Sequence, residues 1–168
     1  MKARRQDLFI TKWNARYRGQ SFPCAIGRTG IGVKMGEGDG ITPKGIFRLC
    51  LIGARPDRRS VVARVPQKMI SPLDYWSDDP SDPDYNSWQR GGRPRVSHER
   101  LRRADPLYDM IGVLDFNWPI AVPGAGSAIF LHVWRKPRHP TEGCIAFAHH
   151  HLAYIFATWT TDARIVIA

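Results

Sequence analysis

Glycine and proline interrupt the apolar segments of this chain about every ten residues, and this spacing is the strongest constraint on its fold. The 168 residues include 15 glycines and 13 prolines. Between them lie short apolar runs such as "DLFITKW", "SFPCAIGRTG" and "GIFRLCLIG", with the alternating or continuous apolar pattern of strands. A helical bundle needs longer uninterrupted segments, so the pattern in the first half of the chain predicts a sheet-rich fold.

The second half predicts more strands and two helices. The strand-like runs are "LYDMIGVLDFN" (107–117), "SAIFLHVW" (127–134) and the final "ARIVIA". "AHHHLAYIFATW" predicts an amphipathic helix because its large apolar residues recur at helical spacing, at Leu152, Ile155, Phe156 and Trp159. "SHERLRRA" predicts a short helix with Ser97 as its N-cap. We therefore expect one mostly β domain with short helices that spans 1–168.

The segment from about 66 to 106 differs in composition from the rest of the chain. Its central part, "SPLDYWSDDPSDPDYNSWQRGGRPR", is rich in Pro, Asp, Ser, Tyr and Trp and has no clean periodicity. A long irregular segment within a compact domain is usually functional or disordered. The aromatic residues argue against disorder. We therefore expect an ordered insertion or lid.

The net charge of +10 permits an anionic partner such as nucleic acid, anionic lipid or an acidic polymer. No zinc-finger spacing, RNP-type aromatic cluster or clear helix-turn-helix pattern accompanies this charge, so we expect no nucleic-acid partner. No apolar run approaches the roughly 20 residues that span a bilayer. The basic N-terminal stretch lacks the apolar core of a signal peptide. We expect no membrane span, and nothing in the sequence indicates an oligomeric state.

The chain has three cysteines and a run of three histidines, residue types that form disulfides and bind metals. The number of cysteines is odd, so a single chain keeps at least one free thiol. Cys24 and Cys50 lie in strand-like runs and are expected to be small buried hydrophobes. No CxxC or Cys/His spacing suggests zinc, and the adjacent histidines at 149–151 cannot share one face of a helix. We expect no metal site.

"HPTEGCIAF" (139–147) places Cys144 directly after Gly143 and twelve residues after His132. Cysteine catalysis needs a thiolate, a base and donors for an oxyanion. His132 can supply the base, the N–H groups of Gly143 and Cys144 the donors, and a nearby helix start would lower the pKa of the cysteine. On spacing alone, a small buried hydrophobe is the more frequent outcome for such a cysteine. His139, in the preceding loop, is a rival base.

Two stretches together resemble the L,D-transpeptidase catalytic domain family, often called the YkuD family. "GDGITPKGIF" matches the family segment Gly-Asp-x-x-Thr-Pro-x-Gly-x-Phe, at Gly38, Asp39, Thr42, Pro43, Gly45 and Phe47. "LHVWRKPRHPTEGCIAF" matches its strand-end histidine, variable loop and Gly-Cys motif, at His132, Thr141, Gly143, Cys144 and Ile145. The resemblance extends from about Lys34 to the C-terminus.

The resemblance implies a YkuD-like β-sandwich with a capping insertion, a short helix behind the nucleophile, and an enzyme that crosslinks peptidoglycan stem peptides. Cys144 would attack the carbonyl of a donor stem residue, usually meso-diaminopimelate, and an acceptor amine would resolve the thioester. His132 would be the base, oriented by the backbone carbonyl of Val133, and the Gly143 and Cys144 amides would hold the oxyanion. The resemblance implies no cofactor and makes Cys144 a candidate carbapenem target.

Two positions depart from the family pattern. Glu142 stands where the family has a second histidine, and Ala146 stands where it has Asn or Arg. His132 alone must then act as the base, and other side chains must hold the stems. For this role we expect Arg135, Arg138, Thr141, His98 and Tyr108, although a histidine like His98 is more often a surface or capping residue and a tyrosine like Tyr108 more often a core residue.

The insertion resembles that of a proteobacterial subgroup with "DDPxDxxYN"-type sequences. Such members look suited to a 1-3 bond between L-Ala of one stem and diaminopimelate of another. Substrate contacts are then expected at Asp78, Asp79, Tyr85 and Asn86, because lid carboxylates can bind an ammonium and aromatic rings can cover a glycan or stem. The alternative is that the aspartates cap turns, as Asp beside Pro often does.

Two other functions fit the same residues. In an L,D-carboxypeptidase or amidase, water would resolve the thioester. A non-catalytic peptidoglycan-binding module would explain Glu142 and Ala146, but not the intact Cys144, His132 and Gly143. Peptidoglycan lies outside the cytoplasm, so the periplasm is the expected location although the chain shows no leader.

Overall fold

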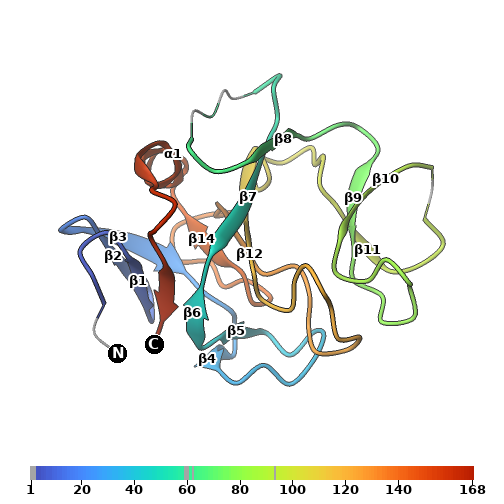
Figure 1. Ribbon diagram of the computed structural model, residues 1–168, viewed down its shortest axis with the longest axis horizontal. Coiled ribbons are helices and arrows are strands. Elements are labelled where there is room, and N and C mark those ends of the chain that lie inside the picture. Colours follow the sequence, from blue (N-terminus) through green and yellow to red (C-terminus); the bar gives the residue numbers. More distant parts are fainter. Residues whose placement is uncertain (1–2, 59–60, 62, 93) are drawn as a thin grey trace.

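The structure, a computed structural model, describes residues 3–58, 61, 63–92 and 94–168. Within these residues the main element is a mixed ten-stranded sheet in the order β6-β15-β1-β2-β3-β14-β13-β12-β7-β8 (Figure 1). Its strands are β1 (Leu8–Thr11), β2 (Asn14–Tyr17), β3 (Gln20–Ala25), β6 (Gly45–Phe47), β7 (Leu49–Ala54), β8 (Gln67–Met69), β12 (Met110–Leu114), β13 (Phe130–Val133), β14 (Ile145–Phe147) and β15 (Ile165–Ile167). The prediction of a mostly β domain is confirmed.

The main sheet curls around the core. Strand β6 lies at one end of the strand order and β7 lies next to the other end, yet only Arg48 separates them in the chain. One residue spans at most about 3.8 Å, so the two ends of the sheet must approach each other. A second, two-stranded sheet pairs β4 (Gly30–Gly32) with β5 (Ile41–Pro43) beside this junction.

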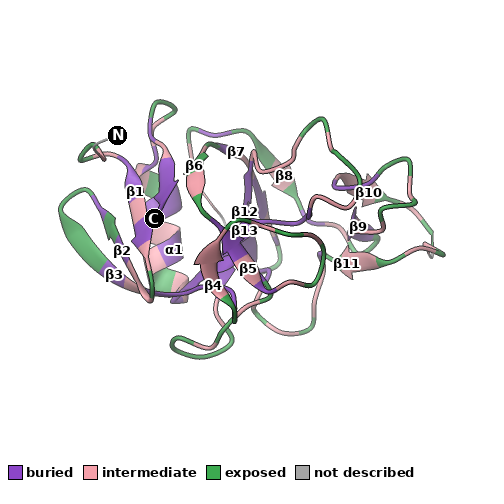
Figure 2. Cartoon of the chain, turned by 90° about the horizontal axis from the view of Figure 1, so that it is seen from below, coloured by how far each residue is buried: buried purple, intermediate pink, exposed green. Residues whose placement is uncertain are grey.

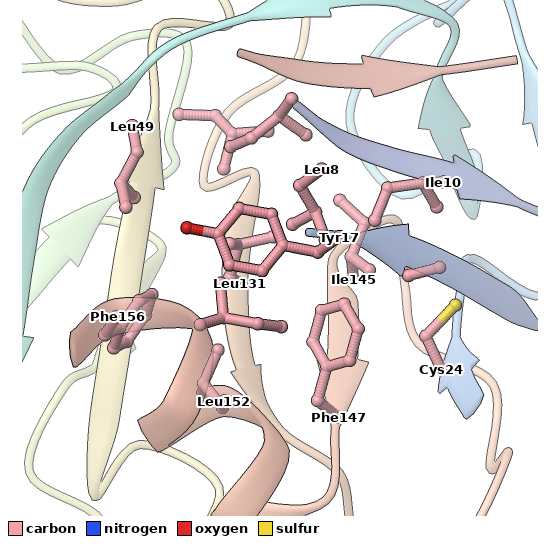
Figure 3. Packing of buried hydrophobic residues seen from close by; sticks show 14 of the residues in the cluster. Leu8, Ile10, Tyr17, Cys24, Leu49, Leu131, Ile145, Phe147, Leu152 and Phe156 are labelled. Atoms are coloured by element: carbon pink, nitrogen blue, oxygen red, sulfur yellow. The ribbon is translucent and has the colours of Figure 1, made fainter. Parts of the chain in front are cut away.

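Helix α1 (His149–Thr158) closes the core. Its buried side chains Leu152 and Phe156 point from the helix into the cluster that holds Leu131 and Phe147 of the central strands, as Figure 3 shows. The predicted helix is thus confirmed over these residues, and Trp159, the last residue of the predicted spacing, lies just beyond its C-terminal end. Among the described residues no helix is both long and apolar enough to cross a membrane.

The centre of the sheet is buried on both faces. Every residue of β12, β13 and β14 is buried, which is why these strands read as continuous apolar runs (Figure 2). Strands β13 and β14 are parallel, and their register pairs His132 with Ala146. The chain therefore enters both strands from the same edge, where Cys144 directly precedes β14.

The described part of the insertion forms a small sheet of its own. Within it β9 (Asp74–Ser77) pairs with β10 (Trp88–Arg90) on one side and with β11 (His98–Arg100) on the other. The prediction of a helix at "SHERLRRA" is wrong, because its first residues form β11, with Glu99 opposite Trp76. Pairing with the free edge of β9 satisfies the backbone of β11 and overrides a weak local helix preference.

Trp76 attaches this small sheet to the main one. Its buried ring packs edge-on against Phe130 of β13, with ring centroids 4.9 Å apart. Its indole N–H donates to Asn86 Oδ1 at 2.9 Å, and the same oxygen accepts the N–H of Ala128 at 3.0 Å. The insertion is thus fixed directly to the loop that leads into β13.

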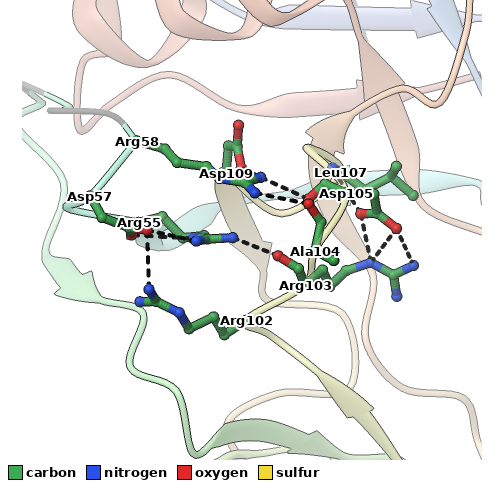
Figure 4. Close-up of polar contacts among 9 residues, drawn as sticks. All are labelled: Arg55, Asp57, Arg58, Arg102, Arg103, Ala104, Asp105, Leu107 and Asp109. Carbon is green, nitrogen blue, oxygen red and sulfur yellow. Dashed lines mark hydrogen bonds and ion pairs between the residues drawn. The ribbon is translucent and has the colours of Figure 1, made fainter.

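Arginine–aspartate contacts tie the end of the insertion back to β7, as Figure 4 shows. Arg55 donates to the Arg103 carbonyl at 2.5 Å. Arg58 donates to Asp109 Oδ1 at 2.8 Å and to the Ala104 carbonyl at 2.8 Å. These contacts fix the base of the insertion beside the start of β12.

The three cysteines are free thiols. Cys24 on β3 is fully buried in the core, as expected. Cys50 on β7 is only partly buried, so its expected burial is wrong in degree. Strand β7 lies close to the end of the sheet, where only β8 follows it, and this position leaves Cys50 partly exposed.

Candidate active site

Two connected hollows meet at Cys144. The larger, here called the first arm, has a volume of about 660 Å³ and lies between β11, the loop before β12 and the segment after β13. The smaller, the second arm, has a volume of about 320 Å³ and lies between the 34–38 loop, β11 and the 127–129 segment. Cys144, Glu99 and Glu142 line both arms.

The thiol of Cys144 is held by backbone groups. It donates to the Ala128 carbonyl at 3.0 Å and accepts the Phe130 N–H at 3.4 Å. Ala128 has a positive φ of 53°, which is uncommon for alanine, and Asn86 fixes this conformation through the Ala128 N–H. The insertion therefore determines where the thiol rests.

The pKa of the Cys144 thiol is raised. Burial raises it to about 12, and the charge of Glu99 adds to this effect, while the Phe130 N–H and Lys34 oppose it. The expectation of a helix start that lowers this pKa is wrong, since Cys144 leads into β14 and α1 begins only at His149. The Cys144 thiol is therefore neutral at neutral pH.

His132 on β13 is buried in the wall of the first arm. Its Nδ1 lies 2.8 Å from the Val133 carbonyl. A carbonyl only accepts hydrogen bonds, so Nδ1 carries the proton and Nε2 keeps a free lone pair. Burial lowers the pKa of His132 to about 4, so the imidazole is neutral at neutral pH. The side chain is thus set up as a proton acceptor through Nε2.

Two threonines hold the loop before Cys144. Thr42 Oγ1 donates to the Gly143 carbonyl at 2.8 Å and accepts the Gly27 N–H at 2.8 Å. Thr141 Oγ1 donates to the Cys144 carbonyl at 2.6 Å and accepts the Gly143 N–H at 3.2 Å. This geometry explains why the Thr-Pro segment and the Gly-Cys segment occur together: the first supports the second.

We expect Gly143→Ala to destabilise the protein by about 1–3 kcal/mol. Gly143 has a φ of +141°, and a Cβ there would lie 2.9 Å from the Ile41 carbonyl oxygen. Neither the backbone of β5 nor the loop can move without disturbing the Thr42 hydrogen bond. Urea unfolding of the variant measures the loss.

Gly124→Ala is the matched control for this substitution. Gly124 also has a positive φ, of +79°, but a Cβ there would meet no atom within 4 Å. The control includes the backbone strain without the steric clash. Equal losses in the two variants would contradict a steric role for the Ile41 carbonyl.

Lys34 is a buried cation in the second arm that sequence reasoning missed. Its side chain is 4% exposed, and its Nζ pairs with Asp39 Oδ1 at 2.6 Å. Burial alone would raise the pKa of Asp39, but Lys34 and the N–H groups of Ile41 and Met35 lower it to about 2. Asp39 thus anchors Lys34 and the glycine-dense loop, and no local pattern in the sequence indicates that Lys34 faces Cys144.

Glu99 is the second residue that sequence reasoning missed. It accepts a hydrogen bond from the Tyr108 hydroxyl, and burial raises its pKa. The sequence "SHERLRRA" predicts a helix there, and that prediction does not say which way the Glu99 side chain points. The pairing of β11 with β9 places it on the cleft.

Of the predicted site residues, the first arm brings together His132, Cys144, Thr141, Tyr108, His98 and Arg135, with His139 also in its wall. Asp78 lines the second arm. The Val133 carbonyl holds His132 as the resemblance implies, whereas the Gly143 N–H, expected as an oxyanion donor, donates to Thr141 Oγ1.

Four predicted substrate contacts lie outside the described linings of both arms: Arg138, Asp79, Tyr85 and Asn86. Asp79 accepts the Ser81 N–H at 2.9 Å and therefore caps a turn. Tyr85 donates to Glu37 and accepts the Gly126 N–H at 3.1 Å. These contacts, with those of Asn86 described above, hold the insertion on the domain.

Comparison with known proteins gives one match. The family model of the YkuD L,D-transpeptidase catalytic domain matches residues 3–167, which includes the insertion and begins well before Lys34. No curated protein and no solved structure matches the chain. Members of the matched family are typically L,D-transpeptidases that act on peptidoglycan. The chain, which places His132 and Cys144 together in one cleft, belongs to the YkuD family of L,D-transpeptidase catalytic domains.

Proposed function

We propose that this protein is a periplasmic peptidoglycan L,D-transpeptidase in which Cys144 is the nucleophile and His132 the base. One observation carries this proposal: a thiol and a neutral imidazole with a free Nε2 line the same arm of the cleft. Family membership supplies the class of substrate.

In the acylation step, the thiol proton leaves the Ala128 carbonyl and passes to His132 Nε2. The sulfur attacks the carbonyl carbon of the donor stem, and the C–N bond to the leaving D-Ala breaks. The imidazolium gives its proton to the departing amine, and a thioester remains on Cys144. In this order of events the thiol stays neutral until the substrate is bound, and this agrees with the raised pKa of the Cys144 thiol.

The first arm fits the donor stem. It is lined by Arg100 and Arg135, and by Arg103, which Asp105 already holds at 2.8 Å, and stem peptides carry carboxylates. Guanidinium groups bind carboxylates with paired hydrogen bonds. Ala146, where most family members have a larger polar residue, leaves room beside His132.

The second arm fits an acceptor amine of the 1-3 type of crosslink. Its charged lining is acidic: Glu37, Asp78 and Glu99 carry no paired cation among the described residues, Glu142 is paired with Arg28, and Asp39 already neutralises Lys34. The side-chain amine of diaminopimelate has a carboxylate on the same carbon, which this lining would repel. A free N-terminal amine of L-Ala has an amide there instead, and the charges favour it.

Incubation of the purified protein with muropeptides tests the proposal. We expect crosslinked stem dimers, a thioester adduct on the protein, and fragmentation that places the new bond between position 1 and position 3. A bond between two diaminopimelates would contradict the 1-3 type. Shortened monomers alone would indicate a hydrolase, and neither product nor adduct would indicate a binding module.

A further inference from the structure

Glu99 lies where the two arms of the cleft join. Strand register places it opposite Trp76, whose ring packs on Phe130, beside the Cys144 thiol. Directly paired residues of neighbouring strands point to the same face, so the Glu99 side chain faces the main sheet. It lines both arms together with Cys144.

The surroundings of Glu99 suit a carboxylate that receives a cation. The Tyr108 hydroxyl holds one of its oxygens. Burial has the largest effect and raises its pKa, and the acidic groups Asp78 and Glu37 raise it further, while the Tyr108 hydrogen bond and the charge of Arg103 lower it. One carboxylate oxygen of Asp78, in the second arm, is buried without a hydrogen-bond partner among the described residues. An ammonium group placed between these carboxylates would offset the repulsion and satisfy that oxygen.

We propose that Glu99 is a catalytic residue of the second step, and that it binds the ammonium of the acceptor and accepts one of its protons. This inference rests on the proposed transpeptidase function and assigns a residue to its acceptor site. It also gives the two steps different first proton acceptors, since His132 lines the first arm and is absent from the described lining of the second.

The step balances as follows. The acceptor ammonium gives one proton to the Glu99 carboxylate and becomes a free amine. The amine nitrogen attacks the thioester carbon, the C–S bond breaks, and the second proton of the nitrogen passes through His132 to the departing sulfur. The products are an amide and the Cys144 thiol, and Glu99 then releases its proton to water.

Glu99→Gln tests the assignment, because glutamine keeps the size of the side chain and an acceptor for the Tyr108 hydroxyl. The acyl-enzyme is formed with a donor stem and then resolved with one of two amines. Glycinamide has an amide on the carbon that bears its amine, and glycine has a carboxylate there. We expect the variant to form the thioester no more slowly than the wild type, because loss of the Glu99 charge removes one of the effects that raise the pKa of the Cys144 thiol. We expect its use of glycinamide to fall by at least about tenfold, the effect of losing one charged hydrogen bond, while glycine is used poorly by both proteins.

Comparison of the glycinamide-to-glycine ratio between the two proteins cancels intrinsic differences in amine reactivity. Asp84→Asn is the matched control, since Asp84 is an exposed carboxylate of the same insertion and is absent from the described linings. It should leave the ratio unchanged. An unchanged ratio in Glu99→Gln, or a thioester that forms more slowly in that variant, would overturn the inference. A wild-type protein that forms no thioester would instead overturn the proposed function.

Discussion

Replacement of Cys144 by alanine is expected to abolish crosslinking, with a loss of at least about 10⁴-fold in rate, because the sulfur is the atom that forms the thioester. Stability should change far less. The substitution removes one buried atom and the hydrogen bonds of the thiol to Ala128 and Phe130, which together contribute about 1–2 kcal/mol. Mass spectrometry of muropeptide products measures the first effect and urea unfolding the second.

Cys24→Ala is the matched control. Cys24 is equally a buried free thiol, but it lies on β3 within the hydrophobic core and outside the described cleft lining. The control should lose stability by a similar amount and keep its activity. A Cys144→Ala protein that still crosslinks stems would exclude the mechanism.

The parts of the fold that could be predicted are those with a local signal. The central strands are buried on both faces and therefore read as apolar runs, and α1 shows its buried face at helical spacing. The small sheet of the insertion gave no such signal. Its strands are short, and they form because β10 and β11 pair with β9. No local pattern of residues indicates this pairing.

The residues of the candidate site also fall into those that the sequence indicates and those that only the fold reveals. His132, Gly143 and Cys144 lie within one short stretch and match a family motif, so their proximity could be expected. Lys34 and Glu99 reach the cleft through the 34–38 loop and through β11, and only the folded chain brings them to Cys144. The prediction of a helix start at Cys144 is wrong because a three-residue strand, β14, lies between the cysteine and α1.

His132→Gln is expected to slow acylation by about 10²–10⁴-fold, the usual effect of removing a general base. The wild-type rate should also show a defined pH dependence. Burial lowers the pKa of His132 from 6.5 to about 4, so the imidazole is protonated, and inactive as a base, only below about pH 4. Acylation should therefore rise with pH through about 4 and stay level through neutral pH. Stopped reactions analysed by intact-protein mass spectrometry give the rate at each pH.

His139→Gln is the control that decides between the two histidines of the first arm. The substitution changes the same type of ring in the same hollow, but His139 is on a loop and its backbone N–H bonds to the Lys136 carbonyl at 3.1 Å. This variant should keep both the wild-type rate of acylation and the rise of that rate near pH 4, here called the acidic limb. If His139→Gln removes the limb while His132→Gln retains it, the base is His139. A wild-type limb near pH 6.5 would mean that the base is a solvated histidine, since only burial in the wall beside β13 moves the pKa of an imidazole this far down.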